Sequence, residues 1–218
     1  MTVSDHSYED LLKKAENFVR DHMAGYDPSH DWPHVDRVRR VAIRIAKTLE
    51  PQPDMLVVEL AALFHDLDDK YRTESSPTLS DLLSPFLSHP CLTSNQAELI
   101  LKIIPNISYT SEIKSRSKNQ WTWQDECKEL FAVQDSDRLD AIGSIGIMRC
   151  SAFSCKINRK LLHDNEDDGH GAEDHFEEKL LKIRDRMKTP FGREEAERRH
   201  QTMVSFLESL QKEKELLQ

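Results

Sequence analysis

The sequence has few of the residues that cross-link small secreted folds. Only four cysteines occur in 218 residues, and none forms a Cys-x-x-Cys pair, so the sequence supports neither a disulfide framework nor a zinc knuckle. Long apolar runs are also missing. The longest, Met55–Phe64, has about half of the ~20 residues that span a bilayer and contains Glu59. It is expected to be a buried helix rather than a membrane span.

Basic side chains are outnumbered by acidic ones. The chain carries 39 acidic and 30 basic side chains, a net charge of −9, which repels a nucleic-acid backbone. We therefore expect no stable nucleic-acid complex. The first residues contain neither a basic leader nor an apolar core, so we expect a location in the cytoplasm or nucleus and no membrane association. Self-association is left open, because no interface can be identified.

Glycine is rare, with only six residues, and no long alternating strand pattern occurs. Apolar residues instead recur at spacings of three and four, which predicts helices. These stretches are residues 8–19, 35–49, 97–104, 176–187 and 203–210. Proline-containing breakers separate most of them. We predict an all-α protein, and the length favours one compact domain over residues 1–218.

One segment is too acidic and too poor in apolar residues to fold alone. Residues 163–174 are expected to form a mobile loop. His163, His170 and His175 lie in or beside it and could mimic a metal site. Two glycines would leave those ligands unpositioned, so a solvated loop explains the segment as well.

Three separated pieces hold residues of the metal-ligand type where the helical pattern expects core. The first runs from His30 to Val38. Asp31 is a suitable N-cap and Pro33 is tolerated in the first turn. His34 then shares an apolar stripe with Val38, which predicts that it faces inward. A hydrogen-bonded core histidine is the alternative.

The second piece follows the most apolar helix. His65 and Asp66 begin it, and two more carboxylates, Asp68 and Asp69, follow. Acidic groups at a helix C-terminus meet negative partial charge from the backbone, so something positive is expected nearby. Lys70 and Arg72 could supply that charge. A divalent metal would supply it more completely, with His65 as a nitrogen ligand.

The third piece contains Asp137. On a continuous helix, Asp137 would share a face with three small or apolar residues, Val133, Ala141 and Ser144. Gly143 and Gly146 would let a neighbouring helix approach closely. A buried carboxylate needs a partner, which could be Arg138, Arg149 or a metal.

This ordered set of a histidine, a His-Asp doublet and a later aspartate resembles the signature of the HD-domain metal-dependent phosphohydrolases. The resemblance covers nearly the whole chain. Its motifs are His-Asp-x-x-His, Ala-Ala-Leu-x-His-Asp, Asp-x-Asp-Arg-Leu-Asp-Ala-Ile-Gly and His-Phe-x-x-Lys-Leu-Leu. They are similar to a small subgroup of uncharacterised and nucleotide-hydrolysing HD proteins. The resemblance implies a single helical HD-domain fold.

The resemblance also implies metal ligands: His34, His65, Asp66 and Asp137. Asp135 is the rival for the fourth position, and Asp137 is preferred because it heads the Asp-Arg-Leu run. Mn²⁺ is the first choice of metal, with Mg²⁺, Co²⁺ or Ni²⁺ as alternatives. Such a metal polarises a phosphoryl group and lowers the pKa of its water.

Further roles follow for neighbouring residues. His30 is a candidate for contacting phosphate or protonating the leaving group, and Asp69 is a candidate general base. Candidates for neutralising substrate phosphates are Lys70, Arg138, Lys179 and Lys182. Lys179 and Lys182 could equally belong to a solvated helix face.

We therefore expect a metal-dependent phosphohydrolase of small phosphorylated molecules. Nucleotides are the expected substrates, with a nucleoside triphosphate cleaved to a monophosphate and pyrophosphate. A nucleoside monophosphate phosphatase and a cyclic nucleotide phosphodiesterase are alternatives. A metal-containing nucleotide-binding regulatory module is the alternative that is not an enzyme.

Overall fold

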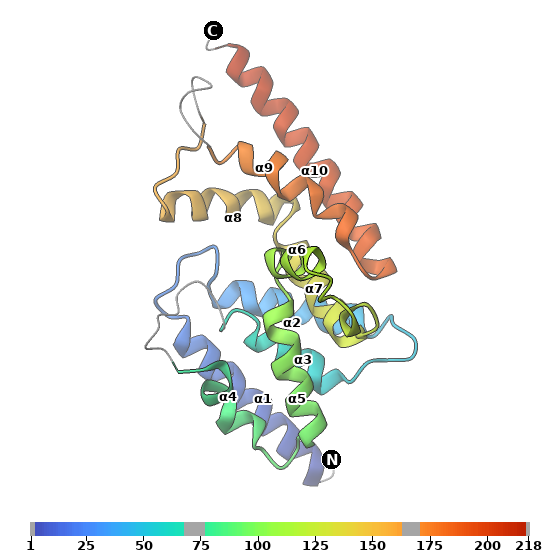
Figure 1. The fold of residues 1–218 in the computed structure, drawn as a ribbon. Helices are drawn as coiled ribbons and strands as arrows, with labels where there is room; N and C mark the ends of the chain where they lie inside the picture. Colours follow the sequence, from blue (N-terminus) through green and yellow to red (C-terminus); the bar gives the residue numbers. More distant parts are fainter. Residues whose placement is uncertain (1–2, 68–76, 163–170, 217–218) are drawn as a thin grey trace. The chain divides into compact units, whose positions relative to one another are not determined.

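The computed structural model describes residues 3–67, 77–162 and 171–216, and α-helices dominate it (Figure 1). Short 3-10 turns lie between some helices, and no β-strand occurs in these ranges. The all-α prediction is confirmed. The α-helices of the described ranges are α1 (Val3–His22), α2 (Trp32–Ala46), α3 (Met55–Phe64), α4 (Leu79–Leu87), α5 (Ser94–Ile103), α6 (Tyr109–Ser117), α7 (Lys128–Asp140), α8 (Gly143–Lys156), α9 (Asp174–Glu178) and α10 (Pro190–Glu215).

The chain divides into two compact units. The first comprises Met1–Tyr26 and His30–Gln134, and the second comprises Asp27–Ser29 and Asp135–Gln218. The single domain over residues 1–218 stays a prediction. So does the mobile acidic loop, since residues 163–170 of it lie outside the described residues.

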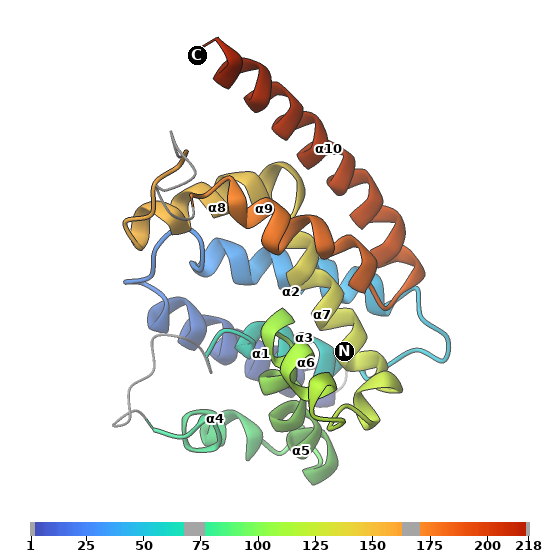
Figure 2. The same ribbon diagram turned by 45° about the horizontal axis from the view of Figure 1, so that its top comes forward.

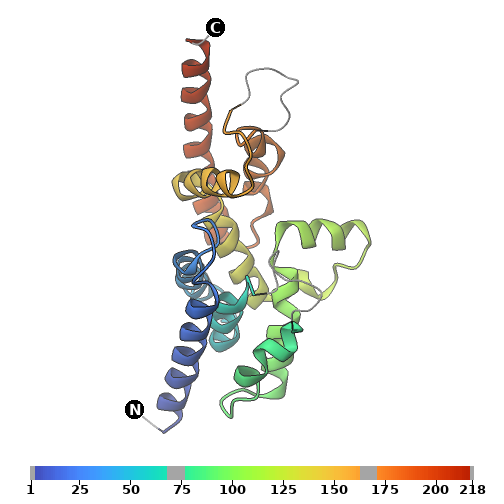
Figure 3. The ribbon, with the colours of Figure 1, turned by 90° about the vertical axis from the view of Figure 1, so that its left-hand side faces the viewer.

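Helix α3 forms the centre of the first unit. Every residue of this helix except Met55 and Glu59 is buried, and it packs against α1, α2 and α5. Figure 3 shows α3 between the blue helices α1 and α2 and the green helices that follow. Burial of each large apolar side chain contributes about 1.5–3 kcal/mol. The C-terminal end of α3 is therefore held by a dense core.

The partly buried charge on α3 is compensated. Arg39 of α2 donates from Nε to Oε1 of Glu59 at 2.9 Å, and its Nη1 donates to Glu16 of α1 at 3.0 Å. One guanidinium thus binds carboxylates on both neighbouring helices. This arrangement explains how an acidic residue is accommodated in the most apolar segment of the chain.

In the second unit, α8 packs against the long helix α10. Figure 2 shows α10 in red, running past α8 and α9. The contact is close at Gly143, where an added Cβ would lie 2.9 Å from Cβ of Arg199. The expected close approach of a helix at Gly143 is therefore confirmed.

The prediction that one continuous helix runs from Val133 through Asp137 to Ser144 is wrong. Helix α7 ends at Asp140 and α8 begins at Gly143. Gly143, the first residue of α8, has a φ of +74°, which lies outside the right-handed helical region, so no continuous helix passes through it. Gly146 faces the carbonyl of Ala141, where an added Cβ would lie only 2.3 Å from the oxygen. This glycine packs against the turn between the two helices rather than against a third helix.

The stretch 176–187 also differs from a single helix. It forms α9 and two 3-10 turns, Leu180–Lys182 and Arg184–Arg186. The apolar residues that carried the helical spacing are nevertheless buried: Phe176, Leu180, Ile183 and Met187. Successive short turns present nearly the same face as one helix, so the pattern does not distinguish them.

Among the described helices, none combines the length and the apolar character that a membrane span requires. The compartment stays a prediction.

Candidate metal centre

His34 lies in the first turn of α2, where local capping fixes it. Oδ1 of Asp31 accepts a hydrogen bond from the backbone N–H of His34 at 3.0 Å. Pro33 occupies the same turn, where a missing N–H leaves nothing unsatisfied. His34 is completely buried on the face that also holds Val38 and Ile45. Its predicted inward direction is confirmed.

His65 follows directly on the last residue of α3. Its Nδ1 lies 2.8 Å from the backbone carbonyl oxygen of Ala62. A carbonyl oxygen can only accept, so Nδ1 carries a proton and donates it. In the neutral imidazole with its proton on Nδ1, Nε2 presents a lone pair. The hydrogen bond from Nδ1 to Ala62 orients the imidazole, as a hydrogen bond to the other ring nitrogen usually does in metal-binding histidines.

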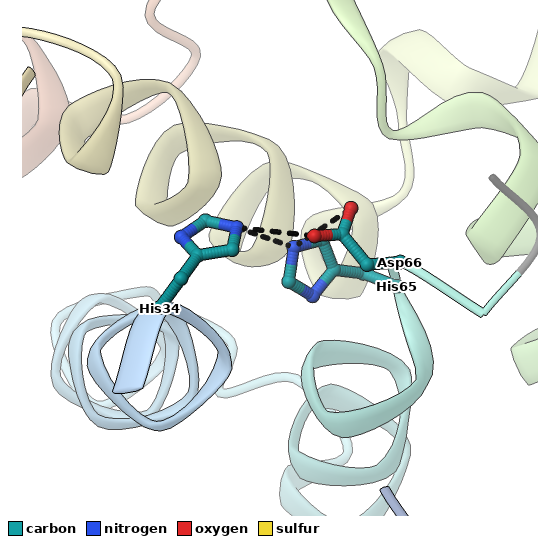
Figure 4. A group of neighbouring side chains, drawn as sticks. All are labelled: His34, His65 and Asp66. Carbon is teal, nitrogen blue, oxygen red and sulfur yellow. Dashed lines mark hydrogen bonds and ion pairs between the residues drawn. The ribbon is translucent and has the colours of Figure 1, made fainter. Parts of the chain in front are cut away.

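The two imidazoles and the carboxylate of Asp66 converge in the first unit (Figure 4). Nε2 of His34 lies 3.1 Å from Nε2 of His65 and 3.3 Å from Oδ2 of Asp66. Nε2 of His65 lies 3.4 Å from Oδ1 of Asp66. One ligand atom from each of the three residues lies within 4.8 Å of the others. Residues from α2 and from the end of α3 thus form one cluster.

Oδ2 of Asp66 is buried, and among the described residues no group donates a hydrogen bond to it. Burial raises the pKa of Asp66, but the adjacent imidazoles of His65 and His34 outweigh burial and hold the pKa well below its usual range. The carboxylate is therefore ionised. A buried anionic oxygen without a donor is costly unless a cation lies beside it.

The same conclusion follows from the contact between the two nitrogens. Two lone pairs 3.1 Å apart repel each other, so either a proton or a cation must lie between the two nitrogens. A divalent metal can take the place of the proton. Two imidazole nitrogens and a carboxylate form a donor set that suits such an ion, so the residues fit the metal implied by the resemblance.

The fourth predicted ligand, Asp137, lies on α7 in the second unit, whereas the other three belong to the first unit. Its role stays a prediction.

The rival, Asp135, has a different environment within the second unit. It is fully buried, and its carboxylate accepts hydrogen bonds from the backbone amides of Lys188 and Thr189, each at 2.8 Å, and from the Thr189 hydroxyl. Burial raises the pKa of Asp135, and these donors oppose that shift. Its satisfied oxygens favour a structural role.

The other predicted site residues have varied surroundings. The ring of His30 lies edge-on to that of His34, with 6.1 Å between centroids. Arg138 is buried and donates from Nη1 to the backbone carbonyl of Arg186 at 2.9 Å, a contact that suits a structural role.

Lys179 is half-buried and Lys182 is exposed. Their contacts with substrate stay predictions. Asp69, the predicted general base, and Lys70, a predicted phosphate contact, lie outside the described residues.

The contacts of Arg149 and Asp135 had no clear signal in the sequence. Arg149, considered above as a partner of Asp137, binds Asp140 at 3.1 Å and the backbone carbonyl of Ser29 at 2.7 Å. The Thr-Pro pair at residues 189 and 190 is one of the proline-containing breakers of the sequence. Nothing in this pair indicates that Asp135 accepts hydrogen bonds from Thr189 at the start of α10.

Comparison with known proteins identifies relatives of the whole chain, although no protein-family model matches it. The uncharacterized protein YpgQ of Bacillus subtilis (strain 168) is 34% identical over 206 residues, which cover 93% of this chain and 94% of that protein. The uncharacterized protein L803 of Acanthamoeba polyphaga mimivirus is 26% identical over 240 residues, which cover 92% and 96% of the two chains.

Solved structures agree with these relationships. The crystal structure of Bacillus subtilis YpgQ in complex with ADP matches with a TM-score of 0.73 and 29% identity, over 93% of this chain and 97% of that chain. An HD-superfamily hydrolase from Bacillus thuringiensis matches with a TM-score of 0.70 and 31% identity, over 94% and 97%. With its His-Asp cluster and its helical fold, the chain belongs to the HD superfamily of metal-dependent phosphohydrolases.

Proposed function

We propose that this protein hydrolyses nucleotides with a bound Mn²⁺ ion, and that a nucleoside triphosphate is cleaved to the monophosphate and pyrophosphate. The observation that carries the proposal is the buried Oδ2 of Asp66. It lies 3.3 Å from a histidine nitrogen, and no described residue donates a hydrogen bond to it. Such an oxygen is suited to a cation.

The ligands in this proposal are His34, His65, Asp66 and Asp137. Mixed nitrogen and oxygen donors favour Mn²⁺ over Mg²⁺, which prefers oxygen ligands alone. A divalent ion held there would polarise a phosphoryl oxygen and lower the pKa of a water molecule. The chain's own contribution is to fix the donors. The hydrogen bond from His65 to Ala62 keeps Nε2 directed into the cluster.

The nucleotide substrate is supported by the ADP complex of YpgQ, which shares 29% identity with this chain in that comparison. In the proposed reaction, His30 contacts a phosphate oxygen or protonates the leaving group. The ring of His30 lies edge-on to His34, and therefore beside the cluster. Lys179 and Lys182 offset the net charge of −9 toward an anionic substrate.

The test incubates the purified protein with Mn²⁺ and a panel of nucleoside mono-, di-, tri- and cyclic phosphates, and measures phosphate and pyrophosphate separately. We expect pyrophosphate from triphosphates and its loss in Asp137→Ala. Asp185→Ala is the matched control, since Asp185 is an exposed aspartate of the second unit that pairs with Arg184. Phosphate release from monophosphates would favour the nucleotidase instead. Tight nucleotide binding without turnover under any divalent metal would contradict the proposal.

A further inference from the structure

Arg149 and Asp140 form an ion pair that is almost removed from water. Nη1 of Arg149 lies 3.1 Å from Oδ2 of Asp140, and the two side chains are 12% and 6% exposed. Asp140 is the last residue of α7 and Arg149 lies on α8, both in the second unit. Buried ion pairs contribute little net stability compared with apolar residues of similar size. A geometric role is therefore the more informative explanation for this pair.

The same guanidinium holds a backbone carbonyl. Nε of Arg149 donates to the carbonyl oxygen of Ser29 at 2.7 Å. Ser29 is buried, and its own amide donates to Oδ1 of Asp27 at 3.0 Å. Its hydroxyl donates to the same oxygen. The Asp27 side chain thereby closes a turn that presents the Ser29 carbonyl. These residues, 27–29, belong to the second unit together with Arg149.

The Ser29 carbonyl belongs to the peptide group that joins Ser29 to His30. Fixing that oxygen fixes the plane of the peptide from which His30 extends. The planar fork of arginine is required for this, because one donor must point at the Asp140 carboxylate and another at the carbonyl. A lysine ammonium is a single centre on a flexible stem and cannot hold both in the same way.

We propose that Arg149 is a positioning residue for His30. Asp140 orients the Arg149 guanidinium, the guanidinium holds the Ser29–His30 peptide, and the imidazole of His30 is thereby set for its contact with the substrate phosphate or leaving group. This inference rests on the proposed function, which assigns that contact to His30. Misplacement of such a group by about 1 Å can lower turnover by up to about 100-fold.

A double-mutant cycle separates positioning from general structural support. Arg149→Lys keeps the charge and is expected to lower kcat for triphosphate hydrolysis about 10-fold, with KM changed less than about twofold. In a His30→Ala background the same substitution should change kcat by less than about twofold, because the residue through which it acts is gone. Arg40→Lys is the control, since Arg40 is an exposed arginine of α2 that pairs with Asp36. It should leave both constants unchanged.

Equal loss of kcat on Arg149→Lys in both backgrounds would overturn the inference, and so would an unchanged kcat in the otherwise native protein. Asp27→Ala provides a second variant if Arg149→Lys does not fold. It removes the acceptor that closes the turn, and the same dependence on His30 is expected.

A measurement without turnover keeps this test independent of the proposed reaction. In protein labelled with ¹⁵N-histidine, Arg149→Lys should shift the imidazole signals of His30, identified by their absence in His30→Ala, and leave those of His200 in place. If the native protein hydrolyses no nucleotide, the proposed function fails while these signals still report on the contact. If the chemical shifts of the His30 imidazole are unchanged in Arg149→Lys, that result alone contradicts the positioning role.

Discussion

The carboxylate of Asp135 accepts hydrogen bonds from both the backbone amide and the hydroxyl of Thr189, at 2.8 and 2.7 Å. The Thr189 hydroxyl also accepts from the amide of Gly192 at 2.9 Å. Gly192 leaves room for this arrangement, because an added Cβ would lie 2.2 Å from Oδ2 of Asp135. Asp135 therefore anchors the start of α10, two residues away from the predicted metal ligand Asp137.

This difference in role predicts different consequences for the two aspartates. Asp135→Ala leaves the amides of Lys188 and Thr189 and the Thr189 hydroxyl without their acceptor, so the free energy of unfolding should fall by about 2–4 kcal/mol. Asp137→Ala should lower it by less, but should abolish the stabilisation by Mn²⁺. Urea unfolding with and without Mn²⁺ measures both effects. The assignment of ligands would be wrong if Asp135→Ala, still folded, lost the response to Mn²⁺ and Asp137→Ala kept it.

Gly143 and Gly25 offer a matched pair of glycines. An alanine at Gly143 would hold a φ of +74° and place its Cβ 2.9 Å from Cβ of Arg199, whereas a Cβ at Gly25 meets nothing within 4 Å. Gly143→Ala should lower the free energy of unfolding by about 1–3 kcal/mol. Gly25→Ala should change it by less than about 0.5 kcal/mol. Equal thermal stabilities of the two variants would disprove this account of the break between α7 and α8.

Glu195 gives a dependence of stability on pH. Hydrogen bonds from Arg198 and Arg199 lower the pKa of Glu195 to about 2, against a smaller opposing contribution from burial. The unfolded value is about 4.3, so the unfolded chain binds the proton more tightly. The stabilisation is therefore present above about pH 4.5 and is lost as the pH falls toward 2.

The corresponding variant is Glu195→Gln. Because Glu195 is partly exposed, the expected loss at pH 7 is below about 1 kcal/mol. Urea unfolding of the native protein and the variant at pH 7 and pH 3 measures the difference, which should shrink at the lower pH. A difference that is constant with pH would refute the role given to the charge of Glu195.

Metal binding should be visible as thermal stabilisation. A ligand at ~100-fold its dissociation constant stabilises the folded state by roughly 2.7 kcal/mol, which corresponds to about 5–10 °C in Tm for a chain of this length. We expect this rise with Mn²⁺, its reversal by a chelator and its loss in Asp66→Asn. Asp36→Asn changes an aspartate that pairs with an exposed arginine and should keep the rise. A Tm that Mn²⁺ leaves unchanged in the native protein would contradict the metal centre.

Much of the cluster was predictable from local patterns. The cap at Asp31 and the apolar stripe of α2 oriented His34 inward, and an unusually apolar helix followed by His65 and Asp66 marked the second element. Both features depend on residues within a few turns of each other. Helix periodicity and capping depend on neighbouring residues, so both can be predicted from the sequence.

The sequence by itself determined the helical class, the inward histidine and the order of the ligand-type residues, because spacing along a helix decides which side chains share a face. Only the tertiary structure decided the contact of 3.1 Å between His34 and His65, the engagement of Asp135 by Thr189 and the break at Gly143. These depend on how helices far apart in the chain pack, and on backbone groups that have no signature in the side-chain pattern.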